Sequence, residues 1–168
     1  HAVVLGMGGS SLAPEVFGKL TESLGAPGGL KLSILDSTCP EQVIAVRKNV
    51  PLDKTIFFVS SKSGTTSEMD AGFRYFWEEL EKAGQTAPER HFVAISDPGT
   101  ILEKLAKEKG FRGIFSANPN VGGRYSALIE FGLLPAVVAG VDVNTLLGSA
   151  EDMMISCNDS DDQVLNPG

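Results

Sequence analysis

The chain has 168 residues, a net charge of −7 and a hydrophobic content of 42%, which predicts one soluble globular domain with a substantial core. Its Lys and Arg residues are scattered rather than gathered into one stripe, so we expect no nucleic-acid surface. Residues 127–141 form the longest weakly charged stretch, which is too short to span a membrane, and the two Cys and two His residues have no metal-ligand spacing. We therefore expect a reduced, metal-free cytoplasmic protein.

Apolar, strand-like runs alternate with amphipathic segments along the chain. The expected strands cover residues 2–5, 31–35, 55–59, 91–95 and 113–115, and the expected helices cover residues 12–24, 40–49, 66–84, 100–110, 127–139 and 144–156. This alternation predicts an α/β fold, a three-layer αβα sandwich with a five-stranded parallel sheet in the flavodoxin-like order 2-1-3-4-5.

The last expected helix contains Met153 and Met154, which we place in the core, and the acidic run at residues 159–162 is expected to be a solvated loop. The chain begins almost inside its first strand. We therefore expect residues 1–168 to be a single domain that is part of a longer protein.

A hydroxyl-rich loop, residues 60–68, follows the third expected strand. Thr65 and Glu68 fit a capping box that starts a helix at about Thr66 and leaves its first N–H groups pointing into the loop. Gly64 allows a close backbone approach, and Lys62 adds a positive charge. Further hydrogen-bond donors are the hydroxyls of Ser61, Ser63, Thr65 and Thr66. The pattern favours a phosphate ligand, since an ordinary capped helix would explain only Thr65 and Glu68.

A glycine-rich loop with the sequence Gly-Met-Gly-Gly-Ser-Ser, residues 6–11, follows the first expected strand. If the first and third strands are neighbours, this loop meets the hydroxyl-rich loop at the carboxyl edge of the sheet, where the strands end. An alternative is a dinucleotide fingerprint with Asp36 as the ribose-binding acid, although Ser11 replaces the expected glycine or alanine. That alternative gives the hydroxyl-rich loop no role. A P-loop is excluded because no Gly-Lys-Ser/Thr sequence closes a glycine loop.

Arg124 lies in a third motif, Gly-Gly-Arg-Tyr-Ser at residues 122–126, which we call the arginine motif. Between glycines and a helix start, a guanidinium can be held rigidly with its face toward a pocket. A solvent-facing arginine after a glycine turn is equally compatible with the motif alone. Asp36, Asp97 and Glu130 are interpreted as ordinary acids at strand ends or on a helix face.

In order and spacing, the three loops resemble the motifs of the first sugar isomerase (SIS) domain of the phosphoglucose isomerase family, and the resemblance covers nearly the whole chain. The Ser-Lys-Ser-Gly-Thr-Thr form of residues 61–66 departs from the Ser-Lys-Thr-Phe-Thr-Thr of many members. It is similar to the isomerase half of bifunctional transaldolase/phosphoglucose isomerase proteins. The resemblance implies an aldose-ketose isomerase of glycolysis and gluconeogenesis that interconverts glucose 6-phosphate and fructose 6-phosphate.

The resemblance also implies roles for the residues that match the motifs. Gly123 and Arg124 would lie against the reacting end of the sugar, where Arg124 stabilises the enediolate, and Glu68 would be a supporting acid. No redox or metal cofactor is implied. The sugar phosphate would be held by Gly9, Ser10, Ser61, the backbone N–H of Lys62, Ser63 and Thr66.

Other implied components lie outside this chain. They are a second SIS domain of the same protein, a homodimeric partner, and the catalytic Glu and ring-opening Lys and His, with the His coming from the neighbouring subunit. We therefore expect this chain to bind a sugar phosphate without isomerising it. SIS domains also serve as non-catalytic sensors in regulators, and this alternative remains open. Arg124 favours the isomerase, because binding alone does not require a cation at the far end of the sugar.

Overall fold

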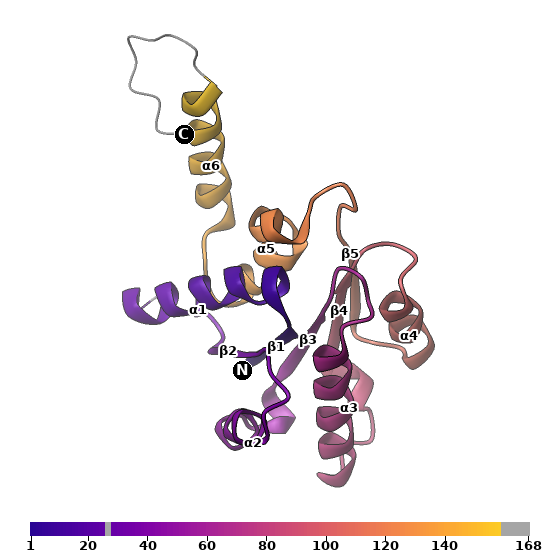
Figure 1. Cartoon of the computed structure of the whole chain (residues 1–168). Helices are drawn as coiled ribbons and strands as arrows, with labels where there is room; N and C mark the ends of the chain where they lie inside the picture. Colours follow the sequence, from indigo (N-terminus) through magenta and orange to yellow (C-terminus); the bar gives the residue numbers. More distant parts are fainter. Residues whose placement is uncertain (26–27, 159–168) are drawn as a thin grey trace.

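The computed structural model describes residues 1–25 and 28–158. Within these residues, five parallel strands form one sheet in the order β2-β1-β3-β4-β5 (Figure 1). The strands are β1 (Ala2–Gly6), β2 (Leu32–Leu35), β3 (Ile56–Ser60), β4 (Phe92–Ser96) and β5 (Gly113–Ser116). The predicted α/β class and strand order are confirmed.

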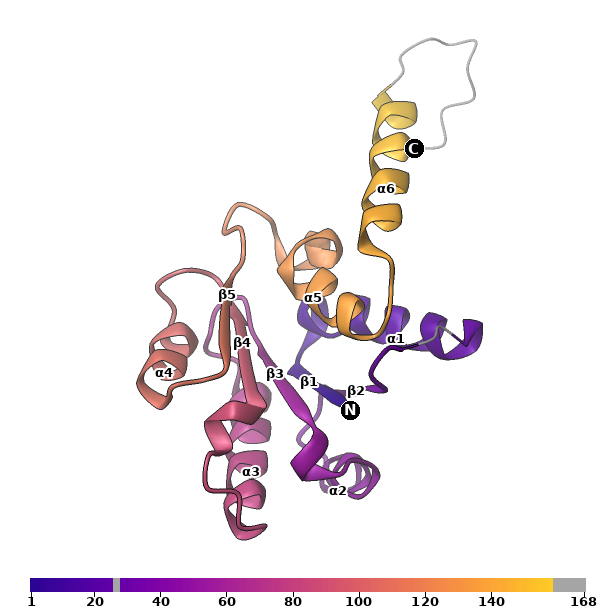
Figure 2. The same ribbon diagram turned by 180° about the vertical axis from the view of Figure 1, so that it is seen from behind.

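The helices are α1 (Leu12–Leu24), α2 (Pro40–Asn49), α3 (Ser67–Lys82), α4 (Ile101–Lys109), α5 (Glu130–Val138) and α6 (Val143–Asn158), with the short 3₁₀ helices η1 (Gly8–Ser10), η2 (Leu52–Lys54), η3 (Pro88–His91) and η4 (Gly123–Leu128). Helices α1 to α4 lie between successive strands, and α5 and α6 follow β5. Figures 1 and 2 show α2, α3 and α4 on one face of the sheet and α1 and α5 on the other. The βα alternation therefore produces the three layers that the sequence predicts.

In the part of the chain that the structure describes, two apolar clusters, one on each face of the sheet, form the core. Val3, Phe57 and Phe92 pack with side chains of α3 on one face, and Val4 and Phe58 pack with side chains of α5 on the other. Successive residues of a strand point to opposite faces, so a sheet covered on both sides needs continuous apolar strands. Each fully buried Phe contributes about 1.5–3 kcal/mol through its burial.

The strand register places the ends of four strands at the same edge. Gly6 of β1 pairs with Ser60 of β3, Ser60 pairs with Ile95 of β4, and Ser96 pairs with Ser116 of β5. The loops that follow these strands therefore emerge side by side, although they are far apart in the sequence.

The sequence predicted a helix over residues 127–139 directly after the arginine motif, but the structure differs. Residues 123–128 form the 3₁₀ helix η4, and α5 begins only at Glu130. The Ser126 hydroxyl donates to the Gly123 carbonyl at 2.6 Å, which tightens the turn, and Ile129 has an extended backbone that separates the two helices.

The last helix, α6, forms as predicted, but the expectation that it lies in the core is wrong. Met153 is 54% exposed and Met154 is 56% exposed, and none of its described residues is buried. Figures 1 and 2 both show α6 extending away from the sheet. The acidic run at residues 159–162 lies outside the described residues.

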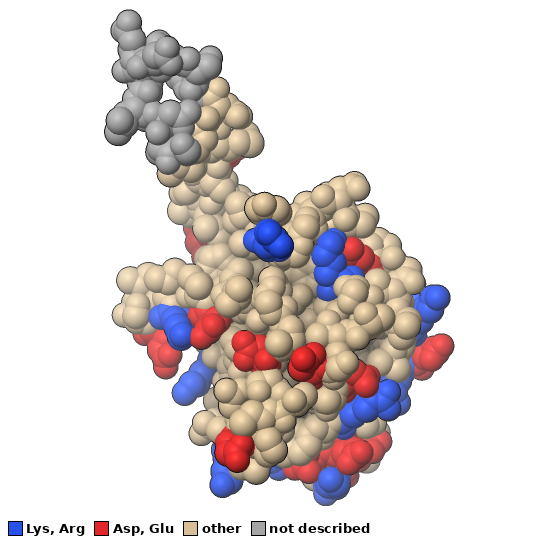
Figure 3. Space-filling model, viewed as in Figure 1, with Lys and Arg blue, Asp and Glu red and all other residues tan. Residues whose placement is uncertain are grey.

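Within the described ranges, no helix is long and apolar enough to span a membrane, and no group of three or more His, Cys, Asp or Glu side chains is placed to hold a metal ion. On the face shown in Figure 3, Lys and Arg lie among Asp and Glu instead of forming a continuous basic stripe.

Candidate functional site

A hollow of about 470 Å³ lies at the carboxyl edge of the sheet, between the loops that follow β1, β3 and β4 and the start of η4. We call it the carboxyl-edge hollow. It is lined by Met7, Gly9, Ser10, Lys62, Ser63, Thr66, Asp97 and Gly123. The structure thus brings together parts of all three motifs. Asp36, the ribose-binding acid of the dinucleotide interpretation, is exposed and is not among the lining residues.

The hydroxyl-rich loop presents backbone donors to this hollow. Within the described residues, the N–H groups of Lys62, Ser63 and Thr66 have no hydrogen-bond partner. The loop turns at Gly64, whose φ of +71° is unfavourable for other residues, and a methyl group there would lie 2.7 Å from Cβ of Thr100. Successive free N–H groups beside a helix start are a recurring way to bind an anion.

The predicted capping box does not form. Thr66, the residue before α3, makes no side-chain bond to the helix backbone, because its hydroxyl pairs with that of Ser61 at 2.8 Å. Thr65 pairs with Ser63 at 3.0 Å, and Glu68 has no hydrogen bond in the described part of the chain. The first N–H groups of α3 therefore remain available at the edge of the site.

Ser61 stabilises the hydroxyl-rich loop from inside the protein through hydrogen bonds to other residues of the same loop. It is 2% exposed and is not a lining residue. Its hydroxyl accepts a hydrogen bond from the Gly64 N–H at 3.1 Å and pairs with Thr66. In this structure Ser61 therefore holds the turn, whereas Ser10, Ser63 and Thr66 reach the hollow itself.

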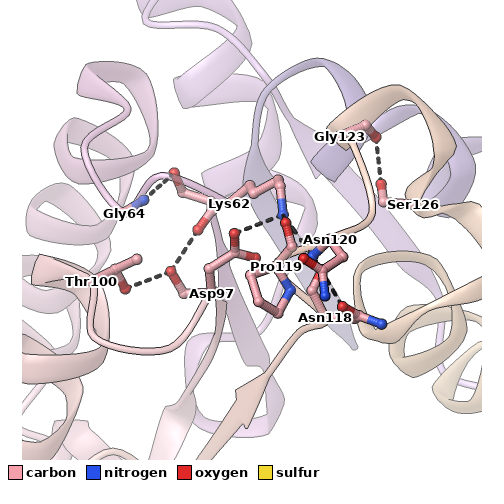
Figure 4. Close-up of polar contacts among 11 residues, drawn as sticks. Lys62, Gly64, Asp97, Thr100, Asn118, Pro119, Asn120, Gly123 and Ser126 are labelled. Carbon is pink, nitrogen blue, oxygen red and sulfur yellow. Dashed lines mark hydrogen bonds and ion pairs between the residues drawn. The ribbon is translucent and has the colours of Figure 1, made fainter.

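The sequence suggested that Lys62 directs a positive charge at the hollow, but in the structure that charge is compensated. Its ammonium donates to Asp97 Oδ2 at 2.6 Å and to the carbonyls of Pro119 at 3.3 Å and Asn118 at 3.5 Å (Figure 4). An ammonium has three donors, and these contacts use all of them. Asp97 follows β4 directly, as expected of a strand-end acid, but the structure also gives it an ion-pair partner that the sequence interpretation did not include. Its position directly after β4, next to β3 in the predicted strand order, was the signal that could have revealed the pair.

The arginine motif is joined to the glycine-rich loop. Ser126 donates to the Gly9 carbonyl at 3.0 Å as well as to that of Gly123. The same contact brings Gly123 into the lining of the hollow. Arg124 is different, because its side chain is exposed and has no hydrogen-bond or ion-pair partner among the described residues. Of the two interpretations that the motif allows, the structure therefore shows the solvent-facing arginine.

Comparison with known sequences gives a match over almost the whole chain. The model of the family described as phosphoglucose isomerase matches residues 1–158. A glucose-6-phosphate isomerase from Carboxydothermus hydrogenoformans is 36% identical over 94% of this chain and 35% of its own length. A probable glucose-6-phosphate isomerase from Methanococcus maripaludis is 34% identical over 96% of this chain and 36% of its own length. The chain thus spans about a third of these relatives.

Solved structures have the same fold. A hypothetical protein from Thermus thermophilus has a TM-score of 0.84 and 32% identity over 94% of this chain and 37% of its own. A glucose-6-phosphate isomerase from Chlamydia trachomatis has a TM-score of 0.74 and 26% identity over 83% of this chain and 26% of its own.

Proposed function

Because this chain belongs to the phosphoglucose isomerase family, we propose that it is the sugar-phosphate-binding domain of a protein that interconverts glucose 6-phosphate and fructose 6-phosphate. The observation that carries the proposal is the convergence of Ser10, Ser63 and Thr66 on the carboxyl-edge hollow beside free backbone N–H groups. A phosphate there would be held by hydrogen bonds to a charged group, each worth about 1.5–3 kcal/mol.

The other end of the sugar would lie toward the arginine motif. Gly123 borders the hollow, and Arg124 is the residue that follows it. Since the Arg124 side chain has no partner within the described residues, it is free to turn toward a bound sugar. In that position a planar cation would stabilise the negative oxygen of an enediolate as a proton moves between C2 and C1.

The base that moves this proton is proposed to lie outside the chain. A base must approach the proton to within about 3 Å, directly or through a water molecule. Asp97, which lines the hollow, is paired with Lys62, and Glu68 is not among the lining residues. We therefore assign the catalytic Glu and the ring-opening His and Lys to the remaining part of a longer protein. The same proposal includes a second SIS domain in that protein, a homodimeric arrangement and fusion to a transaldolase.

The proposal is tested with two proteins in parallel, the 168-residue chain and the longer protein that contains it. Calorimetry measures fructose 6-phosphate binding to both, and a coupled assay measures conversion of glucose 6-phosphate. We expect both to bind and only the longer protein to turn over.

If neither protein bound sugar phosphate, the proposal would be wrong. Binding by both without turnover by the longer protein would indicate a sensor. Turnover by the short chain that survives repurification and is abolished by a mutation within it would show that the base lies among these residues.

A further inference from the structure

The ion pair between Lys62 and Asp97 borders the carboxyl-edge hollow, where the proposed function places a phosphate. The Lys62 side chain is 27% exposed and the Asp97 side chain 18% exposed, so the pair is largely shielded from water. The second carboxylate oxygen, Oδ1 of Asp97, is buried and has no hydrogen-bond partner in the described part of the chain. Lys62 is therefore the group that compensates the Asp97 charge.

The position of the hydroxyl-rich loop does not depend on this pair alone. The N–H of Asp97 donates to the Lys62 carbonyl at 3.3 Å, and the Ser96 hydroxyl donates to the Ser61 carbonyl at 2.7 Å. Figure 4 shows the Lys62 side chain reaching across to Asp97, Asn118 and Pro119. An amide oxygen in place of the carboxylate could still accept a hydrogen bond from Lys62. Replacing Asp97 by Asn should therefore remove the charge while leaving the loop held.

We propose that Asp97 is a specificity-determining residue, which cancels the charge of Lys62 at the hollow so that a phosphate is selected by directed hydrogen bonds rather than by net charge. This inference rests on the proposed function. A pocket with an uncompensated lysine would attract any polyanion, and increasingly so as the anion's charge rises. With Asp97 present, the loop that meets the ligand carries no net charge from the pair. A single phosphomonoester that fits the free N–H groups and hydroxyls is then favoured over more highly charged phosphates.

The experiment measures dissociation constants by calorimetry at low ionic strength on the 168-residue chain. The probes are inorganic phosphate, fructose 6-phosphate and pyrophosphate. The variants are Asp97→Asn and, as a matched control, Asp152→Asn, which makes the same chemical change at an exposed site on α6. We expect Asp97→Asn to tighten phosphate and fructose 6-phosphate binding about fivefold and pyrophosphate binding by a clearly larger factor. The control should stay within about twofold of the wild type, because Asp152 is exposed on a helix that extends away from the sheet (Figure 1), so its charge acts on the hollow only through water of high dielectric constant.

Comparing the gain in affinity among the three anions distinguishes the proposal from a purely structural role of Asp97. If Asp97 only held the loop in place, its loss would weaken all three anions to a similar extent. A second substitution provides another check, because Lys62→Met in the Asp97→Asn background should abolish the gain. Unchanged binding, weaker binding, or a gain equal for all three anions would overturn the proposal.

Folding is monitored by thermal unfolding of each variant. If Asp97→Asn did not fold, Asp97→Ser would replace it, and failure of both variants to fold would overturn the proposal by showing that the pair is required to hold the loop. Wild-type chain that bound none of the probes would contradict the proposed function and this inference together. The wild-type chain could instead bind fructose 6-phosphate while Asp97→Asn showed no larger gain for pyrophosphate than for the other two anions. That result would contradict this inference alone.

Discussion

The backbone of Gly9 lies so close to that of Gly123 that a methyl group on Gly9 would come within 2.0 Å of the Gly123 carbonyl oxygen. One hydroxyl, that of Ser126, donates to both carbonyls, at 3.0 Å for Gly9 and 2.6 Å for Gly123. Residues more than a hundred positions apart in the sequence therefore form one wall of the carboxyl-edge hollow, and this wall requires glycine at position 9.

We predict that Gly9→Ala destabilises the protein by about 1–3 kcal/mol, the usual cost of forcing extra atoms into a packed site. The contact is with backbone, so no side-chain rotation can relieve it. Gly123→Ala is the matched control, because a methyl group there meets nothing within 4 Å and Gly123 does not have a positive φ. Chemical denaturation of the two variants measures the difference. Equal stability would show that the two loops can separate at little cost.

Thr66 is predicted to contribute one hydrogen bond to the bound phosphate. Thr66→Ala should weaken fructose 6-phosphate binding by about tenfold or more, the effect of losing a hydrogen bond to a charged group. Thr66→Ser keeps the hydroxyl and should bind within a few-fold of the wild type. Calorimetry on the folded variants tests this, and an Ala variant with wild-type affinity would remove Thr66 from the site.

Arg124 is predicted to act on the reaction rather than on affinity. In the longer protein, Arg124→Ala should lower kcat by about 10²–10³ with a smaller change in KM, because the guanidinium stabilises charge that develops in the transition state. Arg124→Lys should rescue little if a planar cation is needed. The thermal midpoint should not change, since Arg124 is exposed and has no partner among the described residues. A change in KM alone would make Arg124 a binding residue.

The sequence was sufficient to predict the arrangement of loops but not the partners of individual side chains. Alternating strands and helices predict a parallel sheet, and the strand order then places the glycine-rich loop beside the hydroxyl-rich loop. The partner of Thr66 is Ser61 rather than the helix backbone, and such a choice depends on the backbone conformation of one turn. Similarly, the apolar residues of α6 predict a helix, whereas burial of Met153 requires a second element that the described residues do not supply.

Arg47 of α2 and Glu79 of α3 form an ion pair at 2.9 Å that links the two helices. The Arg47 guanidinium lowers the pKa of Glu79 below its usual range, against the opposing effect of burial. A lowered pKa in the folded state means that the stabilisation is present near neutral pH and is lost as the pH falls through the pKa of folded Glu79. Glu79→Gln should therefore cost about 0.5–1 kcal/mol at about pH 7 and little at about pH 3.

The measurement is denaturation of the wild type and Glu79→Gln across this pH range. Glu78→Gln, at a more exposed carboxylate on the same helix, serves as the control and should show a smaller difference. A cost for Glu79→Gln that does not change with pH would show that the ion pair does not account for it.

The position of a bound phosphate tests the central claim most directly. A crystal structure of the 168-residue chain with fructose 6-phosphate should place the phosphate at the carboxyl-edge hollow, within hydrogen-bond distance of the Ser63 and Thr66 hydroxyls and the Lys62 N–H. A second hollow, of about 380 Å³, is lined by Lys54, Arg90 and Arg112 among other residues and provides a charged competitor elsewhere on the molecule. Phosphate density in that hollow, with the hydroxyl-rich loop empty, would contradict the account.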